Sequence, residues 1–336
     1  MSYWRNKQVL VTGASGFLGG WLVSRLLREG AHVVCIIRRP HPLSQFEIEH
    51  LERRTTIISG PAEDMTLVGG AIKGHSFSAA FHLAALPEVN AAFRDPRATI
   101  AASVDTTLVL LEALRRDSPA TIAVIVSSDK AYGAQSIPYR EDQALNPRHP
   151  YEIAKATQDH IAQMYGRLYG LPVAITRCGN YFGGYDFTFE RIIPYTIRQI
   201  LGNKAPLLRS DGQFTRDFLY VEEAARVHML LAERLAKEPE LRGEAFNFSH
   251  ELSITVVALV HKIAEVMGSN LRPVIGTGAK SEIPHMRLDC TKARKILGWV
   301  PEVTFEEGLQ RTVNWYANNL PRLESLLSER AYSTSP

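Results

Sequence analysis

The chain has 336 residues, 45% of them hydrophobic and 22% charged, which is typical of a soluble globular protein with a sizeable core. The formal net charge of +3 is small and no block of lysine and arginine occurs, which argues against nucleic-acid binding. No apolar run approaches the ~18 residues that span a bilayer, and the N-terminus lacks a signal-peptide pattern. We therefore expect no membrane association. Cys35, Cys178 and Cys290 lack metal-ligand spacing, so no metal site is expected, and Cys35 and Cys178 lie in or beside apolar runs, where we expect buried core thiols. An odd number of cysteines without a leader favours a cytoplasmic location.

The first half of the chain alternates short apolar runs with helical patterns. We expect strands at residues 7–13, 31–39, 55–60, 77–86, 120–128 and 171–180. We expect helices at residues 16–30, 65–73, 95–117 and 149–170. Val- and Ile-rich runs separated by helices predict a parallel sheet covered on both faces, and right-handed crossovers make it a doubly wound α/β Rossmann sheet.

The alternation of apolar runs and helical patterns ends at about residue 180, where proline, glycine, aromatic and charged residues are concentrated. Helical patterns return at residues 254–267 and 304–319. We therefore expect a dinucleotide-binding Rossmann domain over residues 1–179 together with about 216–250. A smaller, irregular α/β substrate-binding lobe is expected over 180–215 and 251–320, followed by a fraying tail over 321–336.

A glycine-rich turn follows the first predicted strand. Gly13, Gly16 and Gly19 allow close approach of a pyrophosphate, and the next helix would supply N–H donors. The spacing is G-x-x-G-x-x-G, and simple close packing is the alternative. The second strand ends with Arg38 and Arg39 where an acid would hold ribose hydroxyls, so a 2′-phosphate, and hence NADP, is slightly favoured over NAD.

Two residue pairs suggest chemistry. Tyr151 and Lys155 lie four residues apart on one face of a predicted helix, where the cation would lower the tyrosine pKa below ~10 and make it a base. An ordinary i,i+4 pair on an amphipathic helix is the alternative. Asp129 and Lys130 follow the strand at 120–128, at the edge where such sheets bind ligands; a pair that caps the strand end is the alternative.

Together with "TGASGFLG", "FHLAA", "YEIAK" and "RDFLYVEE", these motifs resemble the extended short-chain dehydrogenases/reductases that act on nucleotide sugars. Over residues 4–316, "SSDKAYG", "HPYEIAKA", "TRCGNYFGG" and "EIPHMRLD" are most similar to the CDP-glucose 4,6-dehydratase type. The resemblance implies conversion of a nucleotide-diphosphate hexose to its 4-keto-6-deoxy form, with a tightly bound and recycled nicotinamide cofactor. It also implies a homodimer, joined by a four-helix interface of residues 96–116 and 149–169.

The resemblance implies roles for individual residues. Ser128, Tyr151 and Lys155 would oxidise the sugar at C4, and Asp129 as acid and Lys130 as base would then remove water. A lysine base must be neutral, whereas an adjacent aspartate favours the ammonium, so the two are expected to titrate as a pair. The implied cofactor-binding residues are Gly13, Ser15, Gly16, Phe17, Leu18, Gly19, Arg38, Arg39, Leu83, Ala84, Ala85, Ser127, Tyr151 and Lys155. The implied substrate-binding residues are Asn180, Arg191, Arg216 and Arg287.

Three positions depart from the pattern of the resembled group. Pro61 stands where an aspartate near adenine is usual, Ser103 where an asparagine is common, and Leu86 where the dehydratases often have glutamine. A nucleotide-sugar 4-epimerase remains an alternative, because it needs only the hydroxyl, tyrosine and lysine. A non-catalytic dinucleotide-binding sensor is a second alternative, since fold does not fix function.

Overall fold

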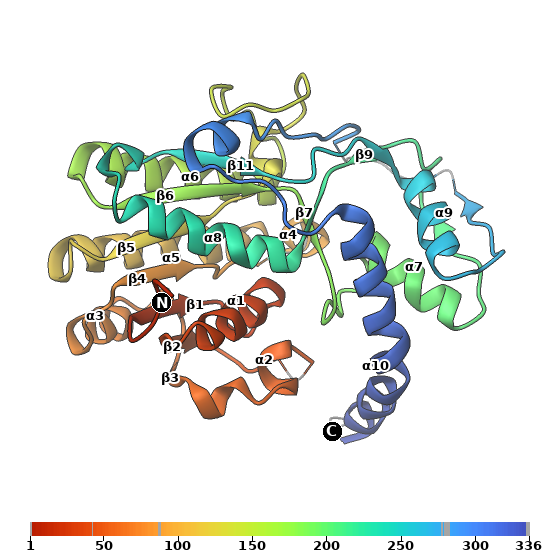
Figure 1. The fold of residues 1–336 in the computed structure, drawn as a ribbon, viewed down its shortest axis with the longest axis horizontal. Helices are drawn as coiled ribbons and strands as arrows, with labels where there is room; N and C mark the ends of the chain where they lie inside the picture. Colours follow the sequence, from red (N-terminus) through yellow and green to blue (C-terminus); the bar gives the residue numbers. More distant parts are fainter. Residues whose placement is uncertain (1, 42, 87–88, 277, 279–282, 334–336) are drawn as a thin grey trace.

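A seven-stranded parallel sheet forms the centre of the protein in the computed structural model, which describes residues 2–41, 43–86, 89–276, 278 and 283–333 (Figure 1). The strand order is β11-β6-β5-β4-β1-β2-β3, and every neighbouring pair is parallel. The strands are β1 Gln8–Thr12, β2 His32–Ile37, β3 Thr56–Ser59, β4 Ala79–His82, β5 Ile122–Val126, β6 Val173–Cys178 and β11 Ala245–Phe248. The predicted doubly wound sheet is confirmed, whereas β11 was not expected as a strand.

Helices cover both faces of the sheet because the strand residues alternate in direction. Val9 and Val11 of β1 belong to a core with helices α1 and α8, whereas Leu10 belongs to a second core with α3, α5 and α6. These helices are α1 Phe17–Arg28, α3 Met65–Gly74, α5 Pro96–Asp117, α6 Pro150–Tyr169 and α8 Val221–Leu235. Each face therefore buries one of the two side-chain sets of every central strand, as expected for a sheet with helices on both sides.

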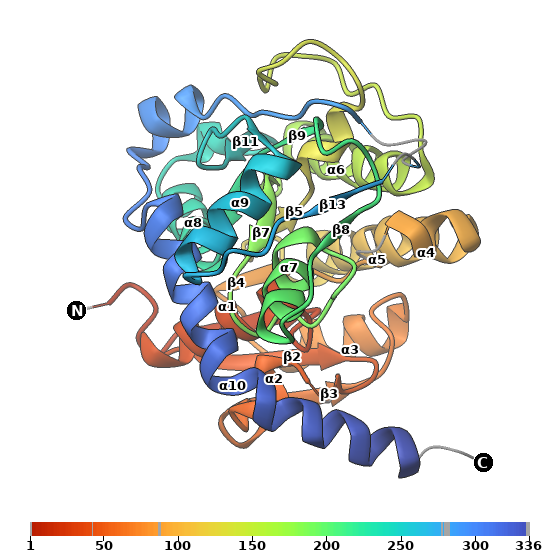
Figure 2. The same cartoon turned by 90° about the vertical axis from the view of Figure 1, so that its right-hand side faces the viewer.

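The second half of the chain adds a smaller lobe beside the sheet. Helices α7 Ile192–Leu201, α9 Val256–Val266 and α10 Phe305–Ser333 lie together there, as Figures 1 and 2 show. Three two-stranded ladders accompany them: β7 Asn180–Phe182 with β10 Phe218–Tyr220, β8 Leu207–Leu208 with β13 Val274–Ile275, and β9 Thr215–Arg216 with β12 Ile254–Thr255. Short helices α2 Gln45–Ile48 and α4 Val89–Arg94 complete the Rossmann side.

Two helix boundaries in the lobe differ from the sequence prediction. Helix α9 begins at Val256, because Thr255 caps its first turn through a hydrogen bond from Ala258 N and Ile254 pairs as a strand. The tail expected from residue 321 is helical as far as Ser333; buried Leu320 and Leu323 show that apolar packing continues on both sides of Pro321. Within the described residues, no helix is both long and apolar enough to cross a membrane.

Candidate active site

The candidate residues gather where the central parallel strands end. Ser127 and Ser128 follow β5, and the next four residues form a 3-10 turn, η2 Asp129–Tyr132. The glycine turn at Gly13 follows β1, which is separated from β5 only by β4. Because the carboxyl ends of parallel strands lie on one edge, the sheet brings these segments to the side where such folds bind ligands.

The glycine turn has the geometry of a dinucleotide cradle. Gly13 has φ +72°, and a Cβ there would lie 2.8 Å from the backbone carbon of Leu83. A Cβ at Gly19 would overlap the Gly13 carbonyl oxygen. Gly16 is the N-cap of α1 and offers no capping side chain, so first-turn N–H groups remain open to an anion. Close packing accounts for two glycines, but the uncapped helix end fits a pyrophosphate.

The segments around this turn place the other predicted cofactor residues beside it. After β4, Leu83 N donates to Thr12 O at 3.2 Å and Ala84 N donates to Thr12 Oγ1 at 3.3 Å, which fixes residues 83–85 against the turn. Ser15 Oγ donates to Arg39 O at 3.4 Å. Of the two residues after Gly16, Leu18 is buried in the core, and the Phe17 ring lies partly buried against it. Ser127 Oγ donates to Lys155 O at 3.3 Å.

Arg38 does not have the surroundings expected for a 2′-phosphate site. Its Nη2 lies 2.5 Å from both carboxylate oxygens of Glu63, so the guanidinium already faces a carboxylate. The slight preference for NADP drawn from Arg38 and Arg39 is therefore withdrawn. The sequence shows two adjacent arginines, but it does not show that folding brings Glu63 into contact with Arg38. Asp64, the next acid, caps helix α3 through hydrogen bonds from Thr66 N and Leu67 N.

Tyr151 and Lys155 lie in the first two turns of α6, but their surroundings differ from expectation. Burial raises the pKa of Tyr151 to about 12, the Asp129 charge adds to this, and Arg191 and the Ser128 hydroxyl act against it. Lys155 Nζ instead donates to Val126 O at 2.7 Å and to Gln158 Oε1 at 2.9 Å. Burial lowers the Lys155 pKa to about 8. The prediction that Lys155 lowers the Tyr151 pKa below its usual value was wrong for this arrangement, because desolvation dominates.

Four polar side chains meet at the η2 turn. Ser128 Oγ donates to Asp129 Oδ1 at 3.0 Å, and Lys130 Nζ lies 3.7 Å from the same oxygen. Lys130 Nζ also donates to Asn180 Oδ1 at 2.9 Å. Asp129 is 1% exposed, and its Oδ2 is buried without a hydrogen-bond partner among the described residues. A buried acceptor without a partner is costly in a folded protein, so this oxygen marks the turn as a place prepared for another group.

The four predicted substrate residues are only partly brought together. Asn180 joins the site directly, since its amide bonds both Lys130 Nζ and the Asp217 carbonyl. Arg191 pairs with Asp186 at 3.1 Å, and its charge reaches Tyr151. Arg216 lies further out in the lobe, where its Nη1 donates to the carbonyls of residues 215, 283 and 284. Arg287 is exposed, with its carbonyl accepting from Tyr139 N at 2.8 Å.

Several residues near the site were not predicted. Gln158 contacts Lys155, and its position three residues further along the same helix was a readable signal. Asp159 binds Arg177 through two hydrogen bonds of 2.8 and 2.9 Å, in a pair only 0% and 3% exposed. Asp217 accepts from three backbone N–H groups, those of residues 218, 252 and 288. These buried acids join segments that are distant in sequence, so no local pattern indicates them.

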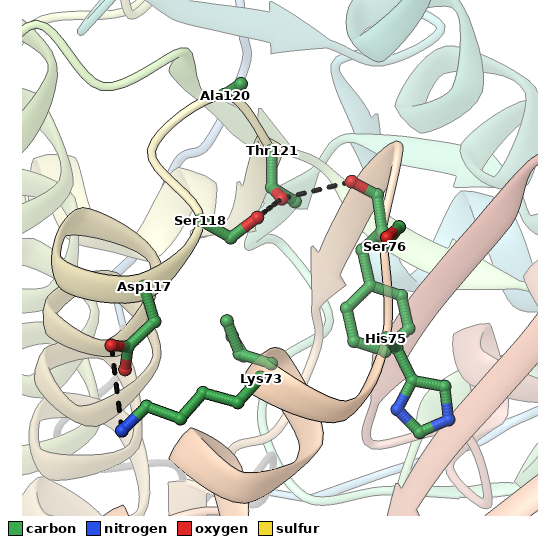
Figure 3. A pocket seen from close by; sticks show the side chains of 9 residues that line it. Lys73, His75, Ser76, Asp117, Ser118, Ala120 and Thr121 are labelled. Carbon is green, nitrogen blue, oxygen red and sulfur yellow. Dashed lines mark hydrogen bonds and ion pairs between the residues drawn. The ribbon is translucent and has the colours of Figure 1, made fainter.

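A separate hollow of about 400 Å³ lies at the opposite edge of the sheet (Figure 3). It is lined by residues that precede β4 and β5: Ile72, Lys73, His75, Ser76, Phe77, Asp117, Ser118, Ala120 and Thr121. Lys73 pairs with Asp117 at 3.8 Å and Ser118 bonds Thr121 at 2.9 Å, so its polar groups have partners. None of the candidate site residues lines this hollow, and we assign the chemistry to the carboxyl edge.

Comparisons with known proteins show the family and the fold of the chain. A family model described as GDP-mannose 4,6 dehydratase matches residues 10–312. The chain is 29% identical over 330 residues to a CDP-glucose 4,6-dehydratase of Salmonella typhimurium, covering 94% of this chain and 92% of the relative. It resembles a crystal structure of dTDP-glucose 4,6-dehydratase from Streptomyces venezuelae with NAD bound, with a TM-score of 0.82, 28% identity and coverage of 93% and 97%. It equally resembles a UDP-glucose 4-epimerase of Thermotoga maritima, with a TM-score of 0.83, 28% identity and coverage of 93% and 99%.

Proposed function

The chain belongs to the GDP-mannose 4,6 dehydratase family, and from this premise we propose that it is a hydro-lyase that converts a nucleotide-diphosphate hexose to its 4-keto-6-deoxy form. The observation that carries the proposal is the Asp129–Lys130 pair on the turn after β5. It supplies an acid and an amine in addition to Ser128, Tyr151 and Lys155, and a simple epimerase needs only the latter three. The relatives named as dehydratases support the same reaction.

The bound cofactor in this proposal is NAD. The glycine turn and the open first turn of α1 would hold its pyrophosphate, and residues 83–85 would lie along it. Glu63, which binds Arg38 through both carboxylate oxygens, disfavours a 2′-phosphate at the end of β2. When bound, NAD supplies a hydride acceptor for the C4 hydrogen and returns the hydride to C6 later in the cycle.

The residues around Tyr151 would perform the oxidation half of the cycle. Tyr151 takes the C4 hydroxyl proton, and Ser128 holds the same hydroxyl in place. A phenol with a pKa of about 12 is a poor base at neutral pH, so positive charge is needed beside it. Arg191 provides part of this charge, and Lys155 and the oxidised nicotinamide of a bound cofactor would add to it. The tyrosine is thus activated only when the site is loaded.

The Asp129–Lys130 pair would perform the elimination. A ketone at C4 acidifies the C5 hydrogen, because the carbanion left behind is an enolate. Lys130 as a neutral amine removes this proton, and Asp129 as a neutral acid protonates the C6 hydroxyl, which leaves as water. Asp129 Oδ2, the buried oxygen without a described partner, is the oxygen suited to carry the transferred proton. After the hydride has returned to C6, the Lys130 ammonium reprotonates C5 and becomes an amine again. Asp129 regains its proton from the C4 hydroxyl proton that Tyr151 took up, so all three groups return to their starting states.

We propose that the nucleotide sugar binds at the carboxyl edge of the sheet, where the Rossmann domain, residues 1–179 with about 216–250, meets the lobe at the Lys130–Asn180 hydrogen bond. Asn180, Arg191, Arg216 and Arg287 are the residues we propose for the sugar and the diphosphate, since arginine suits phosphate oxygens. CDP-glucose is the proposed substrate, on the similarity of the motifs around Asp129 and Lys130. Helices α5 and α6 remain the proposed four-helix interface of a homodimer; Ile100 and Leu168 on them are 40% and 76% exposed in the single chain.

The test is incubation of purified protein with CDP-, dTDP-, GDP- and UDP-hexoses, followed by mass spectrometry for the loss of one water. Asp129→Asn and Lys130→Met should keep C4 oxidation, seen as reduced nicotinamide absorbance, and lose water elimination. The alternative function is a nucleotide-sugar 4-epimerase. The likeness of the fold to the epimerase of Thermotoga maritima supports this alternative. It predicts C4 inversion without loss of water, and activity that survives both substitutions. Loss of water from none of the four sugars would overturn the dehydratase proposal.

A further inference from the structure

Lys155 is held by a hydrogen-bond chain that leads away from the reacting groups. Its Nζ donates to Val126 O on β5 at 2.7 Å and to Gln158 Oε1 at 2.9 Å. An ammonium has three N–H donors, so one remains for the tyrosine or the cofactor. The two inward bonds therefore fix the direction of the third N–H, and Gln158 is the only side chain among the described residues that supplies one of them.

The chain continues from Gln158 into helix α5. Gln158 Nε2 donates to Thr107 Oγ1 at 2.8 Å, and Thr107 Oγ1 donates to Ser103 O at 2.6 Å. Gln158, Thr107 and Ser103 are all 0% exposed. The amide has one orientation in which both ends are satisfied, because Lys155 requires an acceptor and the Thr107 hydroxyl proton is already used on Ser103 O. This chain thus sets the amide oxygen toward the ammonium.

We propose that Gln158 is a positioning residue that, through Thr107 of α5, fixes the Lys155 ammonium beside the end of β5 and leaves one of its N–H groups for the reacting groups. The role rests on the proposed function for its catalytic consequence, but the effect on Lys155 itself does not. Gln158 acts by placing the oxygen end of a fixed amide dipole against a cation that burial would otherwise neutralise. Removal of the oxygen leaves the ammonium with one described acceptor, the Val126 carbonyl.

The charged groups around Lys155 define the sign of the expected effect. Asp159 on its own helix favours the ammonium but is shared with Arg177 of β6. His82 of β4 is held between Thr12 and Thr106, and burial with the nearby Lys155 lowers its pKa to about 3, so it stays neutral. Asp129 of η2 acts on Tyr151, and α5 contributes the uncharged chain through Thr107. With a Lys155 pKa of about 8, loss of one acceptor moves the titration into the neutral range.

The experiment compares Gln158→Leu and Gln158→Glu with Gln163→Leu. Gln163, a glutamine of the same helix that donates to Asp159 at 2.6 Å, controls for an effect that reaches Lys155 only through the Asp159 charge. Protein labelled with ¹³C at lysine Cε is titrated by NMR, with Lys155→Arg identifying the signal. A hydrogen bond to a charged group gives a shift of about one pKa unit: the Lys155 pKa should fall in Gln158→Leu and rise in Gln158→Glu. Gln163→Leu should leave it within about 0.3 unit.

The same proteins are assayed for kcat and kcat/KM against pH. Since Lys155 must be charged, the fall in rate at alkaline pH should begin about one unit lower in Gln158→Leu and higher in Gln158→Glu. Opposite shifts from two substitutions at one position would not follow from loose packing, and Gln158→Glu still tests the idea if Gln158→Leu does not fold. The inference is overturned if the Lys155 pKa is unchanged in both variants or shifts in the same direction in both. If the Lys155 pKa shifts as expected in both variants but the protein has no dehydratase activity, the proposed function is refuted and the inference about Gln158 stands.

Discussion

Glu63→Gln tests whether one surface carboxylate sets the choice between NAD and NADP. In the wild type, a 2′-phosphate must separate Arg38 from Glu63 and then lie beside the Glu63 charge. The pair is 51% and 37% exposed, so breaking it costs at most about 1 kcal/mol. Repulsion between the carboxylate and a phosphate of about −1.5 charge adds about 1 kcal/mol at ~5 Å in water. Removal of the Glu63 charge should therefore tighten NADP binding about 5- to 30-fold.

The assay is calorimetric titration of cofactor-free protein with NAD and with NADP at low salt and at 0.5 M salt. The NAD Kd should stay unchanged, because NAD has no phosphate at that position. The gain for NADP should shrink at high salt, as expected for an exposed charge effect. Asp142→Asn is the matched control, since it breaks a similarly exposed pair with Arg140 of 2.5 Å. An NADP Kd that changes no more than in this control would refute the reasoning about Glu63.

Three further predictions concern the cradle, the core and the tyrosine. Gly19→Ala should destabilise the fold by about 1–3 kcal/mol and abolish NAD binding, because the added Cβ would overlap backbone oxygen atoms. Gly70→Ala, in an open stretch of α3, should instead stabilise the fold by up to about 1 kcal/mol. Urea unfolding measures the two stabilities, and cofactor titration measures NAD binding. Asp159→Asn should cost about 3–5 kcal/mol in the same unfolding assay by leaving Arg177 buried and unpaired, and a loss under 1 kcal/mol would contradict this. Ultraviolet difference titration against Tyr151→Phe should give a Tyr151 pKa of about 12 without cofactor and a lower value with NAD, and equal values would contradict charge activation.

Most of the sheet was predictable because its signal is local. Six strands are apolar runs bounded by glycine or polar residues, and their helices carry a clear 3.6-residue period. The seventh, β11, contains only Ala245–Phe248 and lies in the irregular half of the chain. Its place beside β6 is set by pairing such as that of Ala245 with Ile175, which joins residues 70 positions apart. Sequence periodicity carries no information on such a contact.

The candidate site divides in the same way. Residues that follow a strand end, such as Gly13 and Asp129, could be placed from the sequence because parallel strands bring their ends to one edge. The Arg38–Glu63 pair could not, since it depends on how the β3–α3 segment packs beside β2. The prediction for the Tyr151 pKa had the wrong direction, for a related reason. Two residues four apart show a possible electrostatic pair, but they do not show how much water the fold removes from it.

In the proposed mechanism the two lysines beside β5 have opposite requirements, and their surroundings differ accordingly. Lys155 must remain charged and fixed, and it has two strong acceptors in the interior, Val126 O and Gln158 Oε1. Lys130 is the proposed base that exchanges a proton with carbon, and its side chain is 23% exposed. Its partner Asn180 is a neutral amide, which orients the amine through one hydrogen bond without adding a charge that would hold the proton. Asp129 Oδ1 lies 3.7 Å from Lys130 Nζ, so the acid and the base of the proposed elimination stand side by side on the same turn.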